Sequence, residues 1–211
     1  MSARNIAIAV VVLVLLALGY FYVKFRGVQQ QAVKWEGPVP EITSENIQKD
    51  GDVTKVEMSS RIDAPVDAVF ATFLTPEKAE GRVPEIKKAT VVSGDDKKKQ
   101  VEFHITTLGQ LQVFTVDLTY DKPGSTVGIK TVEGAIDIDG KYKLTPSPDG
   151  KRTLVQYTAT QRNKLPLPVP QDVERSAIKE QFANLMKAIK KTLADEGKIV
   201  SWLESPLRAA A

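Results

Sequence analysis

Apolar and polar residues alternate along the chain from about position 53. Val56 and Ile62 occupy one set of alternate positions, while charged residues such as Lys55 occupy the other. A period of two places the apolar side chains on one face of a β-strand. The pattern therefore predicts a half-buried strand at the start of a folded body, which we expect to span residues 53–197.

Helical spacing follows this strand directly. Val66, Phe70 and Phe73 recur at intervals of three and four residues, which places them on one face of a short helix. Pro65 suits the start of that helix, because the first helical N–H groups have no intrahelical partner to lose. Thr75, followed by a proline, predicts the start of a second short helix.

Six more alternating runs lie between Ile86 and Gln161, separated by Gly, Pro and Asp residues typical of tight turns. Short turns join antiparallel neighbours, and the polar opposite face indicates that only one side of the sheet is covered. In the segment Gln171–Asp195 the apolar positions again advance by threes and fours. We therefore predict an α+β fold in which this long helix packs on one face of an antiparallel sheet.

An apolar segment of 18 uncharged residues, Ile6–Val23, stands near the start of the chain. As an α-helix it would span about 27 Å, close to the hydrocarbon thickness of a bilayer. The aromatic residues Tyr20–Tyr22 at its end are typical of a membrane interface. We predict a single transmembrane anchor, with its flanks, in residues 1–26. A cleaved signal peptide is the alternative, although its apolar core is usually shorter and ends at small residues.

A linker and a tail flank the predicted body. Residues 27–52 include the run Gly37–Pro40, a composition that favours extended, solvated chain, and residues 198–211 form a C-terminal tail. The basic residues closest to the apolar segment also bear on its orientation. One arginine precedes the segment and Lys24 and Arg26 follow it, and this count alone would place the body on the inner side of the membrane.

Charge and composition exclude several classes of function. The formal net charge of +3 arises within the first 36 residues, and the remainder of the chain is balanced. A body without basic excess is not expected to bind nucleic acid. The chain has no cysteine and one histidine, so thiolate nucleophiles and multi-histidine metal centres are excluded. We expect no metal, no cofactor and no catalytic residue; His104 falls on the predicted solvent side of its strand.

Four stretches of the body resemble a known superfamily. One is the segment Ile62–Phe70, in which the predicted strand leads into the predicted helix. The other three form a predicted hairpin: Gly140–Pro146, Asp149–Gly150 and Thr153–Tyr157. They look like the corresponding segments of the START-like (SRPBCC) superfamily, which includes polyketide cyclases and dehydrases, lipid-transfer proteins and coenzyme Q-binding proteins. The resemblance covers Val53–Glu196 and implies a helix-grip fold of the START-like or Bet v 1-like type. It also implies a bacterial envelope protein whose body lies outside the inner membrane.

The resemblance further implies an apolar cavity between the sheet and the long helix, with a lipid, quinone or polyketide-like molecule as its ligand. The inward positions are the candidate ligand-binding residues: Phe103, Ile105, Phe114, Val116, Leu118, Ile138, Tyr142, Tyr157, Ile178, Phe182 and Met186. For each of them, plain core packing is the alternative. The hydroxyls of Tyr142 and Tyr157 could orient a polar group of the ligand.

Three functions remain open at this point. We expect binding or transfer of a hydrophobic molecule without chemistry, because the inward faces carry no ionisable group other than tyrosines. A cyclase-like or dehydrase-like enzyme is one alternative, and an interaction module with a collapsed cavity is the other. The proline-rich segment before the long helix offers Leu165, Leu167 and Val169 as a pocket mouth or membrane contact. A connector whose apolar residues pack inward is the alternative for that segment.

Overall fold

The computed structural model describes residues 33–38, 40–107, 109–164 and 169–199. The chain divides into two units, Met1–Lys34 and Trp35–Ala211, and every element below belongs to the second. The predicted anchor at Ile6–Val23 lies outside the described residues. Within the described part of the chain, no helix has the length and apolar character needed to cross a bilayer.

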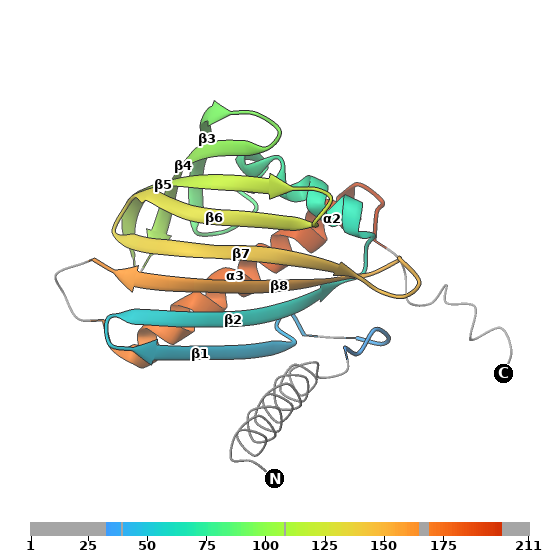
Figure 1. Ribbon diagram of the computed structural model, residues 1–211, viewed down its shortest axis with the longest axis horizontal. Helices are drawn as coiled ribbons and strands as arrows, with labels where there is room; N and C mark the ends of the chain where they lie inside the picture. Colours follow the sequence, from blue (N-terminus) through green and yellow to red (C-terminus); the bar gives the residue numbers. More distant parts are fainter. Residues whose placement is uncertain (1–32, 39, 108, 165–168, 200–211) are drawn as a thin grey trace, which may run out of the picture. The chain divides into compact units, whose positions relative to one another are not determined.

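The body is built on one eight-stranded sheet in which every neighbouring pair is antiparallel (Figure 1). Its spatial order is β1-β2-β8-β7-β6-β5-β4-β3, so β1 and β3 are the edges. The strands are β1 (Ser44–Asp50), β2 (Val53–Ile62), β3 (Ile86–Gly94), β4 (Lys98–Thr107), β5 (Gln110–Asp121), β6 (Thr126–Glu133), β7 (Ile136–Pro146) and β8 (Thr153–Asn163).

Two α-helices and one 3₁₀ turn complete the body. They are α2 (Val66–Phe73), η1 (Pro76–Ala79) and α3 (Gln171–Asp195). Helix α3 begins directly after a proline and has two acidic residues in its first turn, which favour a helix N-terminus. It ends just before Gly197, whose φ of 67° suits glycine after a helix. From β2 onward the predicted α+β order of elements is confirmed, including both ends of α3.

Strand β1 corrects the predicted linker. Residues 44–50 were expected to belong to the extended segment 27–52, but they pair with β2 along their whole length. Their pattern is weak because Ile47 is the single large apolar residue in the strand. Glu45 forms ion pairs of 2.8 Å with two basic side chains of α3. Contacts with distant segments therefore hold this strand, and those contacts leave no periodic signal in its own sequence.

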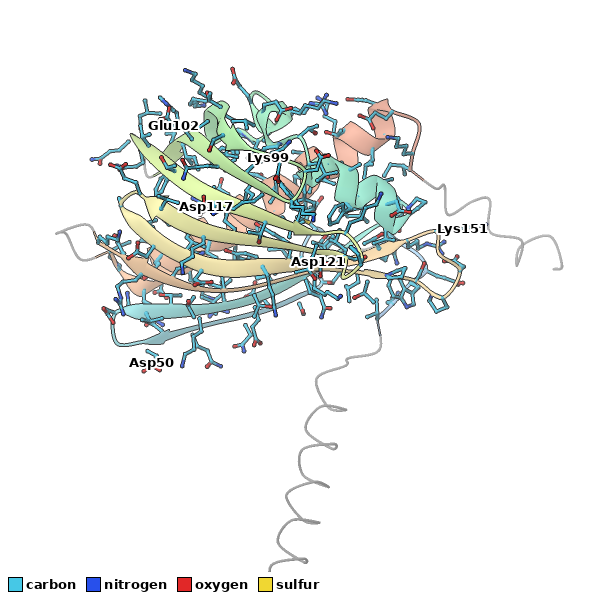
Figure 2. All side chains as sticks on the ribbon, turned by 45° about the horizontal axis from the view of Figure 1, so that its top comes forward. Asp50, Lys99, Glu102, Asp117, Asp121 and Lys151 are labelled. Atoms are coloured by element: carbon cyan, nitrogen blue, oxygen red, sulfur yellow. The ribbon has the colours of Figure 1, made fainter. Side chains whose placement is uncertain are left out.

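The core lies between the curved sheet and α3, which crosses one face of it (Figure 1). Along β5, buried and accessible side chains alternate, with Val116 and Leu118 directed to the core and Asp117 to the other face. Figure 2 shows Asp117 and Glu102 of the neighbouring strand β4 among the charged side chains on the face turned away from α3. One face of the sheet is covered and the other is solvated, as the sequence pattern predicts.

A polar network closes the end of β2. Arg61 is almost fully buried, and its Nε lies 2.9 Å from Asp63 Oδ1. The Arg61 guanidinium also donates a hydrogen bond to the carbonyl oxygen of Gly37. Arg152, in the turn between β7 and β8, is also buried, and its Nε lies 3.7 Å from the same Asp63 oxygen. The network therefore ties the chain that precedes β1 to the sheet and to the start of α2.

Candidate functional site

A cavity of about 460 Å³ lies between the sheet, α3, α2 and η1, and it is partly open to solvent. Its walls come from seven of the eight strands, β2 to β8, together with one face of α3. Most of the lining is apolar, as expected of a pocket for a hydrophobic small molecule. Helix α3 therefore leaves a space between itself and the sheet, and the expected ligand site requires such a space.

Ten of the eleven candidate ligand-binding residues line this cavity. They are Phe103, Ile105, Phe114, Val116, Leu118, Ile138, Tyr142, Tyr157, Ile178 and Phe182. The eleventh, Met186, is fully buried in the core and does not line the cavity. The structure thus brings the set together in one site, and ligand binding by its members stays a prediction.

Further apolar lining comes from residues outside the predicted set. Helix α2, turn η1 and the start of β3 close one side of the cavity, and α3 contributes a longer stretch than expected. These additional residues are Met58, Ala68, Ala71, Phe73, Pro76, Ala79, Val83, Ile86, Ile129, Ile136, Leu185, Ala188 and Ile189. Helical spacing indicates that α2 has an apolar face, but it does not say which surface that face meets.

Charged side chains also line the cavity, which corrects the expectation that tyrosines are its only ionisable groups. They lie in η1, between η1 and β3, and directly after α3, and they are Lys78, Arg82, Glu85, Glu196 and Lys198. Two of them pair with each other, since Lys198 Nζ lies 2.7 Å from Glu196 Oε2. Arg82 donates a hydrogen bond to the hydroxyl of Thr192 on α3.

Glu85 is the least accessible of these charged groups. Asn184 of α3 donates a hydrogen bond of 2.5 Å from Nδ2 to Glu85 Oε1. The other carboxylate oxygen, Oε2, is buried and has no hydrogen-bond partner among the described residues. A buried unpaired carboxylate oxygen is costly in a folded protein, and such groups occur often at functional sites.

Four aromatic rings form a continuous wall of the cavity. Tyr142 of β7 and Tyr157 of β8 are directly opposite partners in the sheet, and their ring centroids are 4.6 Å apart with planes inclined by 25°. Phe73, at the end of α2, lies 5.1 Å from Tyr142 by the same measure, and Phe182 of α3 lies 6.2 Å from Tyr157. The wall therefore runs from α2 across two strands to α3.

The two wall tyrosines are neutral hydrogen-bonding groups. Burial raises the pKa of Tyr157 to about 12. Burial also raises the pKa of Tyr142 well above 10.0, and the negative charge that Tyr157 would carry opposes its ionisation further. Gln161 Nε2 donates a long hydrogen bond of 3.5 Å to the Tyr157 oxygen, and the Tyr142 hydroxyl makes no hydrogen bond with any described residue.

Of the predicted pocket-mouth residues, Leu165 and Leu167 lie outside the described residues. Val169 is half-buried and does not line the cavity, and the role of the segment as mouth or membrane contact stays a prediction. His104 lies off the cavity wall, as predicted, with its Nε2 atom 2.9 Å from a carboxylate oxygen of Glu102.

The arrangement of these elements defines a class of protein. An eight-stranded antiparallel sheet curved around a C-terminal helix, with an apolar cavity between them, is the helix-grip fold. The model of one protein family, "Polyketide cyclase / dehydrase and lipid transport", matches residues 53–194. This match covers most of the chain, and the protein belongs to that family. No protein of curated function matches the chain.

Solved structures share the same fold at low sequence identity. The Zhui aromatase/cyclase from Streptomyces sp. R1128 is similar over 69% of this chain and 96% of its own, with 13% identity and a TM-score of 0.60. A START superfamily protein from Mycobacterium smegmatis matches 67% of this chain and 98% of its own, with 18% identity and a TM-score of 0.57. Major latex-like protein 151 from Panax ginseng matches 64% and 97%, with 15% identity and a TM-score of 0.51.

Proposed function

We propose that the protein binds a hydrophobic small molecule, such as a lipid, quinone or polyketide-like compound, and carries it without transforming it. The observation that supports this function is the cavity of about 460 Å³ with its largely apolar and aromatic lining. The family description includes lipid transport as well as cyclase and dehydrase activity, and each of these roles requires an apolar molecule to be held.

The energetics of burial favour a carrier role beside a membrane. Each methylene removed from water contributes roughly 0.8 kcal/mol, so the ligand has a strong preference for an apolar site over water. Transfer from a bilayer to an equally apolar cavity is nearly balanced. A carrier of this kind therefore changes the rate at which its ligand leaves or enters a membrane more than the final distribution.

The same proposal includes an N-terminal anchor. The 18 uncharged residues Ile6–Val23 support a single membrane span, and the aromatic residues at their end support an interfacial position. We place the body outside the bacterial inner membrane on the basis of the family resemblance. Full-length protein should remain in the membrane pellet after alkaline carbonate washing, while a chain that begins at residue 27 should be released. Release of the full-length chain would contradict the anchor.

A cyclase-like enzyme is the second candidate, and Glu85 is the observation in its favour. Its Oε2 atom is buried without a hydrogen bond, and Arg82 of the same segment also borders the cavity. The Oε2 atom has almost no accessible surface, however, so a substrate could reach it only after movement of the wall. Turnover of a poly-β-ketone substrate that is lost in Glu85→Gln would establish this candidate over a carrier.

A fluorescence titration tests the carrier proposal. N-phenyl-1-naphthylamine is a neutral, apolar dye that fluoresces strongly only in an apolar environment. The full chain should bind it in a saturable manner. Ile138→Trp adds bulk to the cavity wall and should weaken binding by at least about tenfold, since overpacking excludes the ligand. Val113→Trp is the matched control, because Val113 is 48% exposed and does not line the cavity. No saturable binding by the wild type, or equal binding by both variants, would contradict the proposal.

A further inference from the structure

Tyr142 lines the cavity, and its hydroxyl has no hydrogen-bond partner among the described residues. Tyr142 is half-buried, and its oxygen is not among the buried side-chain atoms that lack a partner. No described residue accepts or donates a hydrogen bond at that oxygen. Buried phenols usually have a hydrogen-bond partner, and leaving one without a partner costs free energy.

Tyr157 supplies a second donor beside it. The two residues are directly opposite in β7 and β8, so their side chains leave the same face of the sheet, and their rings are stacked with centroids 4.6 Å apart. The Tyr157 oxygen accepts from Gln161 Nε2, so its own proton is free to be donated to another group. The wall therefore offers two neutral O–H donors side by side.

A carbonyl oxygen is the ligand group that matches this pair. It has two lone pairs and no proton, so it can accept from both hydroxyls at once. A carboxylate or phosphate is less suited to this position, because burying an anion requires paired charge, and the neighbouring wall residues Phe73 and Phe182 carry none. The cationic lining residues belong to η1, to the segment between η1 and β3, and to the segment that follows α3.

We propose that the paired hydroxyls of Tyr142 and Tyr157 form a subsite for a neutral carbonyl oxygen of the bound molecule. This inference rests on the proposed function, because it requires that the cavity hold an apolar ligand. The ligand class is then narrowed to apolar molecules with a ketone, quinone or ester carbonyl, and the stacked rings beside the subsite favour a planar group next to that carbonyl. Both phenols remain protonated at neutral pH, because burial raises both pKa values.

Two probes of the same shape test the subsite. Fluorenone and fluorene differ by one carbonyl oxygen, and competition with N-phenyl-1-naphthylamine gives their affinities for the full chain. Tyr142→Phe and Tyr157→Phe should each weaken fluorenone binding about five- to tenfold, the size of one neutral hydrogen bond. Fluorene affinity should stay within about twofold, because these variants keep the rings. Tyr120→Phe is the control: its hydroxyl donates to the backbone oxygen of Phe73 at 3.0 Å and does not line the cavity.

The outcomes separate the two levels of the proposal. A selective loss of fluorenone affinity in both cavity variants, without one in Tyr120→Phe, supports the carbonyl subsite. Equal changes for fluorenone and fluorene, or no change for either, overturn the subsite and leave the carrier function intact. Binding of neither probe by the wild type overturns the carrier function and the subsite together. Thermal unfolding of each variant confirms that a loss of affinity does not reflect loss of the fold.

Discussion

Two leucines on α3 provide a direct test of whether the cavity is open in solution. Leu193 has no exposed surface and belongs to the packed core, whereas Leu185 is half-buried and borders the cavity. Both are leucines within the same helix, so replacement by alanine changes helix propensity equally. Any difference between Leu185→Ala and Leu193→Ala therefore reports on the packing around each side chain.

The expected magnitudes follow from burial. Leu→Ala removes three carbons, and at roughly 0.8 kcal/mol for each buried carbon the lost transfer free energy at Leu193 is about 2.4 kcal/mol. The hole that remains in a tightly packed core raises the total to about 3–4 kcal/mol. Leu185 already borders empty space, so it has fewer contacts to lose and leaves no closed hole. We expect Leu185→Ala to lower the free energy of unfolding by about 1 kcal/mol.

Urea unfolding followed by far-UV circular dichroism measures both values. With a slope of about 2 kcal/mol/M, the midpoint should fall by roughly 1.5–2 M for Leu193→Ala and by about 0.5 M for Leu185→Ala. Binding of N-phenyl-1-naphthylamine should change only in Leu185→Ala. Equal midpoint shifts would mean that Leu185 is packed as tightly as Leu193. That result would refute the open cavity and favour an interaction module with a collapsed interior.

Three further predictions concern stability. Burial raises the pKa of Tyr157 from 10.0 to about 12, so the unfolded chain loses this proton first. The free energy of unfolding associated with this shift, on the order of 3 kcal/mol, is present below about pH 10 and is lost as the pH rises toward 12. The urea midpoint should therefore be lower at about pH 11.5 than at about pH 9. Tyr157→Phe should reduce this difference between the two midpoints. Asp63→Ala leaves the buried Arg61 without its carboxylate and should cost about 3 kcal/mol in the free energy of unfolding; an unchanged urea midpoint would contradict the network. Gly140→Ala places a Cβ 2.5 Å from the Cβ of Ala159 on β8. Calorimetry should therefore show a lower Tm, with about 1–3 kcal/mol lost from the free energy of unfolding. An unchanged Tm would mean that β7 and β8 can move apart at this point without loss of stability.

Local periodicity was sufficient for most of the elements. Helix α3 has the bounds that its helical pattern predicts, because it buries one continuous face of its own. Strand β2 was found from the alternation in its first half, where burial alternates as far as Met58. Strand β1 was missed for the opposite reason. One large apolar residue, Ile47, gives no recognisable period, and pairing with β2 and ion pairs to α3 hold the strand in place.

The candidate site shows the same division. Inward positions on the strands were predictable, since alternation fixes which side chains share a face. The sequence did not reveal that Phe73 of α2 would extend the aromatic wall or that Glu85 would lie against the cavity. Both side chains reach the site through the path of the chain between β2 and β3. That path depends on contacts with α3, such as the hydrogen bond from Asn184 to Glu85.

The sequence by itself determined the order of the elements, the inward set of side chains and the uncharged N-terminal segment, because each of these is written in residues close together in the chain. The tertiary structure alone decided that Met186 is core while Tyr142 borders a cavity. Both are inward positions of their own patterns, Tyr142 on a strand and Met186 on a helix. They differ because Met186 is packed in the core, whereas a cavity between α3 and the sheet lies beside Tyr142. The position of α3 on the sheet depends on contacts between residues that are far apart in the chain.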